Sequence, residues 1–210
     1  MGYTHYFYNK KKTLATPKKW KEFTNDCQKI FQYCQSNLCI DLANGLSDEN
    51  SQPEITDEHI SFNGSEQQRL GVWTTDEQLS IPWPAEDAGL NDPIADPIAE
   101  KTSGHWFAGN LLKQRVAPRN EVNGLGSGSY ETMWIDRVAE KDGQFNCCKT
   151  AFRPYDLAVT AVLVAAKHHF GNKITVRSDG NESHWMDGKI LCNNILGYGM
   201  DFEFDDDDDE

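Results

Sequence analysis

The segment from Lys149 to Asp156 concentrates side chains that can bind or react with another molecule. Lys149 and Arg153 bring positive charge, while Thr150 brings a hydroxyl group and Tyr155 an aromatic face with a polar tip. The segment leaves a predicted strand and enters a predicted helix, whose first amide groups and dipole favour an anion. The pattern therefore predicts a site for a small anionic, nucleotide-like ligand.

The same segment has a purely structural interpretation. Asp156 would cap the helix, Arg153 would pair with a nearby acid, and Tyr155 would pack into the core. The sequence gives no reason to discard either interpretation, so both stay open.

Three further residues complete the predicted ligand site, namely Asn63, His169 and Asp179. Asn63 lies in an Asn-Gly turn, and Asp179 follows the predicted strand that ends near Arg177. His169 and its neighbour His168 end a predicted helix, where a capping or packing role suits an imidazole. Adjacent helical side chains point about 100° apart, so the two histidines do not form a metal-ligand pair.

Other motifs are rejected. No predicted helix follows the glycine cluster at residues 124–128, although dinucleotide and phosphate-binding loops need one. The run from Asp179 to Ser183 begins like a calcium loop, but the sixth position is His184 and the twelfth is Ile190. We predict no metal and no cofactor. No Ser-His-Asp order stands out either, so an enzyme is disfavoured, although Glu131, Asp156 and Asp179 could converge in space.

A predicted strand, buried helix, strand and helix position the central segment, and together they span Gln144 to Leu196. The predicted elements are a strand at 144–148, a helix apolar on all sides from Pro154 to Gly171, a strand at 173–177, and a helix capped by Ser183. A helix that is apolar around its whole circumference belongs at the centre of a domain.

Further elements come before this unit. They are a strand at 3–8 buried on both sides, a helix that Thr16 caps and Pro17 begins, a strand at 59–64, and a strand at 130–136. The Asp142-Gly143 turn should join the last strand to 144–148 as a hairpin. The fold class is therefore α+β, with a single mixed sheet, about three helices and a central buried helix near 155–170.

The length of 210 residues favours one domain, residues 1–200, in which residues 65–129 form an irregular insertion over the core. The formal charge is −13, and the last ten residues contribute −8 of it, which leaves −5 on the remaining body. We expect residues 201–210 to be a disordered acidic tail.

Composition and charge narrow the functional classes. No apolar run is long enough to cross a membrane and the N-terminus lacks a signal peptide, so a cytoplasmic protein is expected. The cysteines are expected to be reduced core thiols; they are Cys27, Cys34, Cys39, Cys147, Cys148 and Cys192. Direct nucleic-acid binding is disfavoured, because the body is mildly acidic and the lysines from Lys10 to Lys21 form its one basic cluster.

Several short segments carry a resemblance to a family. They are MGYTHY at 1–6, FNG at 62–64, CKTxxxPYD at 148–156, KHHFG at 167–171 and SDG at 178–180. With these motifs the chain resembles a family of small phage and bacterial proteins. The resemblance does not extend over residues 65–129 or the acidic tail, and it implies only a phage or mobile-element context.

That context favours a small binding protein that captures an anionic, nucleotide-like ligand and could sequester a host defence signal. One alternative is an acidic interaction protein whose tail engages a basic host protein as a DNA mimic. Another is an enzyme acting on a nucleotide or nucleic acid, with Glu131, Asp156 or His169 as acid or base. Association of the chain with itself stays open.

Overall fold

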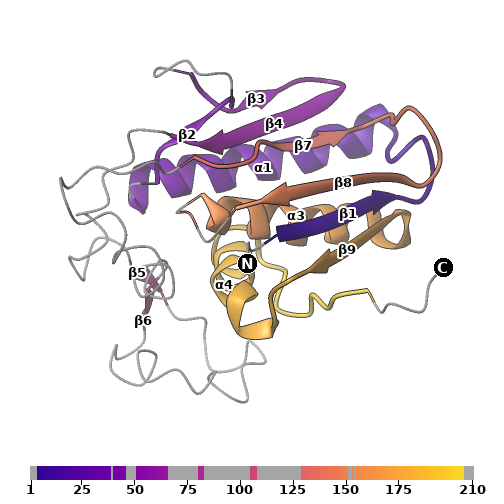
Figure 1. The fold of residues 1–210 in the computed structure, drawn as a ribbon. Coiled ribbons are helices and arrows are strands. Elements are labelled where there is room, and N and C mark those ends of the chain that lie inside the picture. Colours follow the sequence, from indigo (N-terminus) through magenta and orange to yellow (C-terminus); the bar gives the residue numbers. More distant parts are fainter. Residues whose placement is uncertain are drawn as a thin grey trace.

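The computed structural model describes residues 4–38, 40–45, 51–65, 129–150, 153 and 155–205, and the backbone of 80–82 and 105–107. The fold class is α+β, as the sequence predicts (Figure 1). The described strands do not form one mixed sheet. They form separate sheets, and all their pairings are antiparallel.

The first sheet has three strands in the order β8-β1-β9. They are β1 (Thr4–Asn9), β8 (Gln144–Lys149) and β9 (Ile174–Ser178). Strands β8 and β9 both run antiparallel to β1, so they are parallel to each other, and the chain passes from one to the other through a helix. This split β-α-β arrangement places the first strand of the chain between two late ones.

The second sheet is built on β4 (His59–Gly64), which pairs on its two sides with three other strands. They are β2 (Leu42–Ala43), β3 (Glu54–Ile55) and β7 (Met133–Asp136). The predicted hairpin between β7 and β8 is therefore wrong in its pairing, because β7 pairs with β4 and β8 with β1. The predicted turn at Asp142-Gly143 is present, and Gly143 has a positive φ of 69°.

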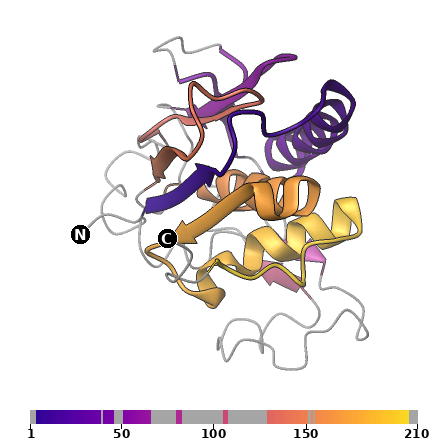
Figure 2. The same cartoon turned by 90° about the vertical axis from the view of Figure 1, so that its right-hand side faces the viewer.

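Three α-helices are described: α1 (Pro17–Asn37), α3 (Asp156–Phe170) and α4 (Glu182–Leu196). They lie on one side of the strands (Figure 2), and α3 packs against both α1 and α4. Helix α3 is buried along nearly its whole length, as its apolar circumference predicts, and Gly171 ends it. The predicted unit from Gln144 to Leu196 is therefore present, with β8, α3, β9 and α4 in order.

Two local predictions need correction. The last helix is capped by Asn181 and not by Ser183, because the Asn181 side chain accepts a hydrogen bond from the His184 amide in a capping box. Strand β1 is not buried on both sides. His5 and Phe7 are buried, but Tyr6 and Tyr8 alternate with them on a half-exposed face that no described helix covers.

The predicted disordered tail begins too early. Phe202 is buried, and the Asp205 carboxylate lies 2.5 Å from the Lys167 ammonium group. Residues 201–205 thus pack on the domain, while residues 206–210 lie outside the described residues. Within the predicted insertion at 65–129, two short strands are described, β5 (Ser80–Pro82) and β6 (His105–Phe107), which pair with each other.

None of the helices in the described part of the chain is both long enough and apolar enough for a membrane span. The described cysteines, which are all of them except Cys39, are free thiols, and Cys147 alone among them is exposed.

Candidate functional site

The candidate site is built around His5, a fully buried histidine in the middle strand of the first sheet. Strand alternation turns His5 toward the helices together with Phe7 and Asn9. The antiparallel register sets Ser178 of β9 directly opposite His5 on one side and Cys148 of β8 on the other. A polar ring in such a place needs partners for both nitrogen atoms.

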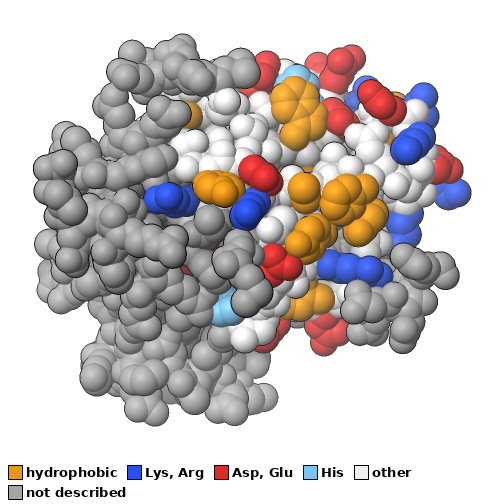
Figure 3. All heavy atoms as spheres, in the orientation of Figure 1, with side chains coloured by type: hydrophobic (Ala, Val, Ile, Leu, Met, Phe, Trp, Pro, Cys, Tyr) orange, Lys and Arg blue, Asp and Glu red, His pale blue; other side chains and the backbone are white. Residues whose placement is uncertain are grey.

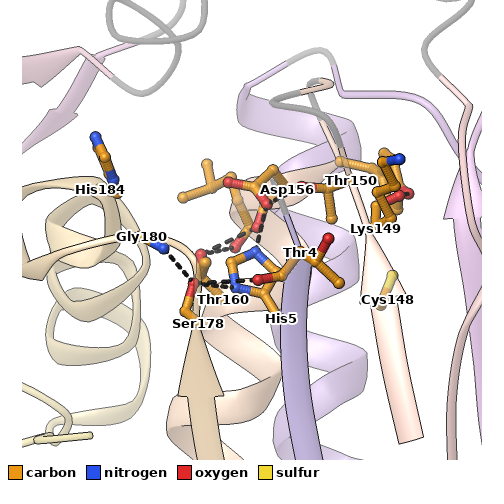
Figure 4. A network of polar contacts seen from close by, with 12 residues as sticks. Thr4, His5, Cys148, Lys149, Thr150, Asp156, Thr160, Ser178, Gly180 and His184 are labelled. Carbon is orange, nitrogen blue, oxygen red and sulfur yellow. Dashed lines mark hydrogen bonds and ion pairs between the residues drawn. The ribbon is translucent and has the colours of Figure 1, made fainter. Parts of the chain in front are cut away.

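Both ring nitrogens of His5 have partners. Nδ1 lies 3.0 Å from the hydroxyl of Ser178, and Nε2 lies 2.7 Å from Oδ1 of Asp156, the first residue of α3. The same Oδ1 atom accepts a 2.5 Å hydrogen bond from the buried Thr150 hydroxyl. Figure 4 shows His5 between Asp156 and Ser178, with Thr150 beyond the carboxylate.

The result is a continuous polar chain of hydroxyl, imidazole, carboxylate and hydroxyl. In chemical terms it is a Ser-His-Asp arrangement, which the sequence did not reveal because its members stand at positions 5, 156 and 178. Such a relay can take a proton from the Ser178 hydroxyl while the carboxylate orients the imidazole and stabilises its protonated form. We call Ser178, His5, Asp156 and Thr150 the relay.

The carboxylate of the relay is held from several sides. Asp156 is nearly buried and begins α3, where a negative charge interacts favourably with the helix dipole. Asp156 does not cap the helix with its side chain, as one sequence interpretation had it, because its described hydrogen bonds go to His5 and Thr150.

The hydroxyl of the relay lies in a turn. The Ser178 oxygen accepts a hydrogen bond of 2.9 Å from the Gly180 amide, and its hydroxyl donates to the carbonyl oxygen of Thr4 at 3.5 Å. Ser178 is half-buried, so this end of the relay is more open to solvent than the imidazole. Asp179, next in the turn, accepts hydrogen bonds from the Thr4 amide and the Tyr6 hydroxyl.

Trp185, in the first part of α4, supports the imidazole from beside it. The two rings meet edge to face with centroids 5.0 Å apart, and Trp185 is fully buried. Trp185 also stacks on Phe202 at 5.0 Å with an interplanar angle of 4°. The position of His5 therefore depends on packing from the C-terminal part of the chain.

Lys149, the residue before Thr150 of the relay, forms a cation-π pair with Tyr130. Lys149 is half-buried, and its ammonium group sits 5.5 Å from the centre of the Tyr130 ring, which is 46% exposed. This distance suits a cation-π contact. Arg153 is also half-buried, and its backbone joins the loop through hydrogen bonds with Thr150 and Asp156.

Tyr155 does not offer the stacking face that the ligand interpretation gave it. Its side chain is fully buried, and its hydroxyl donates to the carbonyl oxygens of Glu131 and Lys149. Burial also raises the pKa of the Tyr155 hydroxyl, so this group stays a neutral donor. The structural interpretation is the correct one for Tyr155, and the exposed ring near Lys149 belongs to Tyr130.

Asn63 also has a structural role, because its side chain forms hydrogen bonds within the protein. It is buried, its amide nitrogen donates to the Tyr130 carbonyl oxygen, and its carbonyl oxygen accepts from the amides of Tyr130 and Gly64. Asn63 thus anchors the segment that carries Tyr130. Its amide group is fully used within the protein.

His169 lies far from the relay, at the other end of α3. Thirteen residues separate it from Asp156, which is about 20 Å along a helix. His169 lies 2.9 Å from the carboxylate of Asp26, which also accepts from the hydroxyl of Tyr198. Burial lowers the pKa of His169, although the Asp26 carboxylate acts in the opposite direction. His169 therefore belongs to a separate cluster.

Sequence reasoning missed His5 and Ser178. One signal was available for His5, because alternation in the first strand predicts it to face the same way as Phe7. A polar side chain on the inward face of a strand needs a buried hydrogen-bond partner. Ser178 gave no such signal, because a Ser-Asp-Gly sequence reads as an ordinary turn.

Within the described residues, no cluster of His, Cys, Asp and Glu could hold a metal ion. Comparisons with models of protein families, with curated proteins and with solved structures found no match for this chain.

Proposed function

We propose that the protein is an enzyme that cleaves an ester bond of an anionic, nucleotide-like substrate through the hydroxyl of Ser178. The observation that carries this proposal is the chain of contacts from Ser178 through His5 to Asp156. Nucleophile, base and orienting group in hydrogen-bond contact are the geometric signature of an activated hydroxyl.

The reaction would proceed in two steps. The Ser178 oxygen attacks the electrophilic carbon or phosphorus atom of the ester, and its proton moves to Nδ1 of His5. The bond to the leaving alcohol breaks, and that alcohol receives the proton from His5. A water molecule then gives a proton to His5 and attacks the ester formed on Ser178; the bond to the Ser178 oxygen breaks, the acid is released, and the proton passes from His5 back to the Ser178 oxygen.

Three residues beside the relay support an anionic substrate with a planar ring. Lys149 and Arg153 flank Thr150 of the relay in the sequence and are half-buried, so each can offer positive charge at the Thr150 end of the relay, although the Lys149 side chain is on the opposite face of the sheet from His5. Tyr130, with its exposed ring against the Lys149 ammonium group, can stack with a base. Lys149 and Arg153 are kept from the sequence-based ligand site, and Tyr130 takes the stacking role that the sequence gave to Tyr155.

The test is covalent labelling with a fluorophosphonate ester, which needs no knowledge of the natural substrate. Attack by Ser178 forms a bond from oxygen to phosphorus and expels fluoride. We expect one label per chain, located at Ser178 by peptide mass spectrometry. Ser178→Ala should not be labelled there, and Asp156→Asn should be labelled at least about 100-fold more slowly.

A matched control separates relay chemistry from general damage. His168→Gln changes an exposed histidine outside the relay and should be labelled at the wild-type rate. Because His5→Gln alters a fully buried position, its folding is checked by circular dichroism before its labelling is measured. Equal labelling of wild type and Ser178→Ala, or no labelling of folded wild type, would overturn the proposal.

A second candidate is capture of the same ligand without reaction, for instance to sequester a host defence signal. It is favoured by the hydrogen bond from the Gly180 amide to Ser178, which gives the hydroxyl a structural use in its turn. In that case a nucleotide bound by Lys149 and Arg153 would be recovered unchanged. Loss of binding in Lys149→Gln without any labelling of Ser178 would identify this candidate.

A further inference from the structure

The three-stranded sheet has one face that no described helix covers. Alternation and register assign eight side chains to this outer face, and we call them the open face. They are Thr4, Tyr6, Tyr8, Phe145, Cys147, Lys149, Thr175 and Arg177, of which Thr175 alone is buried. The helices pack against the opposite face (Figure 2).

Aromatic rings occupy the middle of the open face. Phe145 is 49% exposed, and its ring centre lies 6.2 Å from that of Tyr6 and 5.1 Å from that of Tyr8. Figure 3, drawn in the orientation of Figure 1, shows hydrophobic side chains grouped over these strands, with both basic and acidic side chains beside them. Exposed apolar groups gathered in this way mark a binding surface.

The charge of the open face differs from that of the whole chain. Its eight side chains include Lys149 and Arg177 and no carboxylate, whereas the chain as a whole has a formal charge of −13; the carboxylates of Asp179 and Glu131 contact Tyr6 and the Lys149 backbone at its border. At one end of the strands, Lys10 and Lys173 are joined by a backbone hydrogen bond and add two more positive charges.

Carboxylates at the ends of these strands already have partners. Asp179 accepts from the Tyr6 hydroxyl and the Thr4 amide. Asp142 lies 3.3 Å from the Lys11 ammonium group and also accepts from the Lys12 amide. The Asp179 carboxylate thus reaches the hydroxyl end of Tyr6, and the Glu131 carboxylate accepts a hydrogen bond from the Lys149 amide, so both border the open face and phosphates would have to bind away from them.

We infer that the open face binds a single-stranded nucleic acid. The faces of Phe145, Tyr6 and Tyr8 would stack with unpaired bases, and Lys149 and Arg177 would contact the phosphates. Stacking rings combined with flanking cations are what a sequence-tolerant single-strand site requires. This inference does not use the relay, because the open face is on the opposite side of the sheet from His5, but it shares Lys149 with the proposed substrate site.

The inference reverses an expectation from the sequence, in which the acidic body disfavoured nucleic-acid binding. A sum over the chain averages the two faces of a sheet, whereas the alternation of β1, β8 and β9 separates them. Charge on one surface decides association with a polyanion more directly than the total charge does.

Fluorescence anisotropy with labelled 12-nucleotide single strands of RNA and of DNA tests the inference. We expect saturable binding of at least one of them and binding of the matching 12-base-pair duplex at least tenfold weaker, because paired bases present no free faces. Phe145→Ala should weaken single-strand binding about tenfold. Lys149→Gln should reduce the slope of log affinity against log salt by about 0.7.

Matched variants provide the controls. Trp134→Ala removes another exposed ring, which is already stacked on His59 in the second sheet, and should bind like wild type. Lys18→Gln removes a charge on α1 and should keep the wild-type salt slope. The inference is overturned if neither single strand binds, if the duplex binds equally well, or if Phe145→Ala instead dissolves a dimer seen by sedimentation.

Discussion

At the scale of single residues, the main feature of the site is one buried histidine whose two ring nitrogens both have polar partners. His5 is fully buried, yet its two nitrogen atoms contact Ser178 and Asp156. A carboxylate and a neutral hydroxyl on opposite sides of the ring distinguish its two nitrogens, because the carboxylate favours the proton on Nε2. In the proposed mechanism this asymmetry makes Nδ1 the base that faces Ser178.

The hydroxyl of Thr150 should contribute measurably to stability through Asp156. Thr150→Val preserves the shape of the buried side chain but removes the 2.5 Å hydrogen bond to the carboxylate. We expect the free energy of unfolding to fall by about 2 kcal/mol, measured by urea denaturation. Thr24→Val is the matched control, because Thr24 is buried and donates only to a helix carbonyl. An equal loss in both variants would contradict a special role for Thr150.

His169 should make stability depend on pH. Burial lowers the pKa of His169 in the folded protein, so below about pH 6.5 the unfolded chain binds more protons than the folded one. This contribution to stability is complete above that pH and is lost as the pH falls toward the folded pKa. Urea denaturation between pH 7.5 and 5 should show a smaller decline for His169→Gln than for wild type; parallel curves would contradict the assignment.

Asp26 acts in a different pH window. Burial raises the pKa of Asp26, but hydrogen bonds from Lys29, His169 and Tyr198 outweigh it, so the folded pKa is lowered. Its contribution is present above about pH 3.8 and is lost below that pH. The two groups can therefore be separated in one pH series.

The residues of the site were only partly predictable. The sequence drew attention to the segment from Lys149 to Asp156, and two of its members, Thr150 and Asp156, belong to the relay. It did not connect them to His5 or Ser178, because the strand register that joins residues 5, 148 and 178 is a tertiary property. Tyr155 was ambiguous, because a tyrosine at a helix start can pack or stack equally well.

At the scale of elements, the site depends on the closeness of α3 and α4. Gly188 of α4 faces the start of α3 so closely that a Cβ atom there would lie 2.5 Å from the Thr160 hydroxyl oxygen and 3.0 Å from the Ala161 amide nitrogen. The glycine lets α4 approach α3, and α4 in turn carries Trp185 to the side of His5.

Gly188→Ala should therefore destabilise the protein, although alanine is the better helix former. We expect the free energy of unfolding to fall by about 1 to 3 kcal/mol, measured by urea denaturation. The double variant Thr160→Ala with Gly188→Ala removes the atom nearest the new methyl group, so it should recover part of the loss. A Gly188→Ala protein as stable as wild type would show that the two helices can separate at no cost.

The elements themselves followed from local patterns. Apolar periodicity, Pro17 and Gly171 predicted helices close to their observed limits, because these signals act within a few residues. The prediction of strand pairing was wrong where the pairing depends on distant segments, because β7 pairs with β4 and not with its sequence neighbour β8. The cap of the last helix also moved, because Asn181 and Ser183 are both good caps and only Asn181 has the required extended backbone.

At the scale of the whole molecule, residues 199–205 pack back onto the domain, against α4 and β9, and we call them the C-terminal strap. Phe202 is buried against Trp185, and its carbonyl oxygen accepts from the ammonium group of Lys189. Asp205 pairs with Lys167 and exchanges hydrogen bonds with the backbone of Val176 in β9. The strap thus links the end of the chain to the packing around His5.

Two truncations should separate the strap from the acidic residues that follow it. Removal of residues 206–210 should leave the free energy of unfolding within about 0.5 kcal/mol of wild type. Removal of residues 202–210 should lower it by about 3 to 5 kcal/mol, because it deletes a buried phenylalanine and the Asp205 ion pair. Equal effects of the two truncations in thermal or urea denaturation would contradict a structural strap.

The central claim is that Nδ1 of His5 is a base held ready beside the Ser178 hydroxyl. Nitrogen-15 NMR of the histidine side chains at pH 8, with the His5 signals identified by their loss in His5→Gln, tests it most directly. We predict a proton on Nε2, shared with Asp156, and an unprotonated Nδ1 at 3.0 Å from Ser178. A proton on Nδ1 would make Ser178 only an acceptor, and the relay could not activate it.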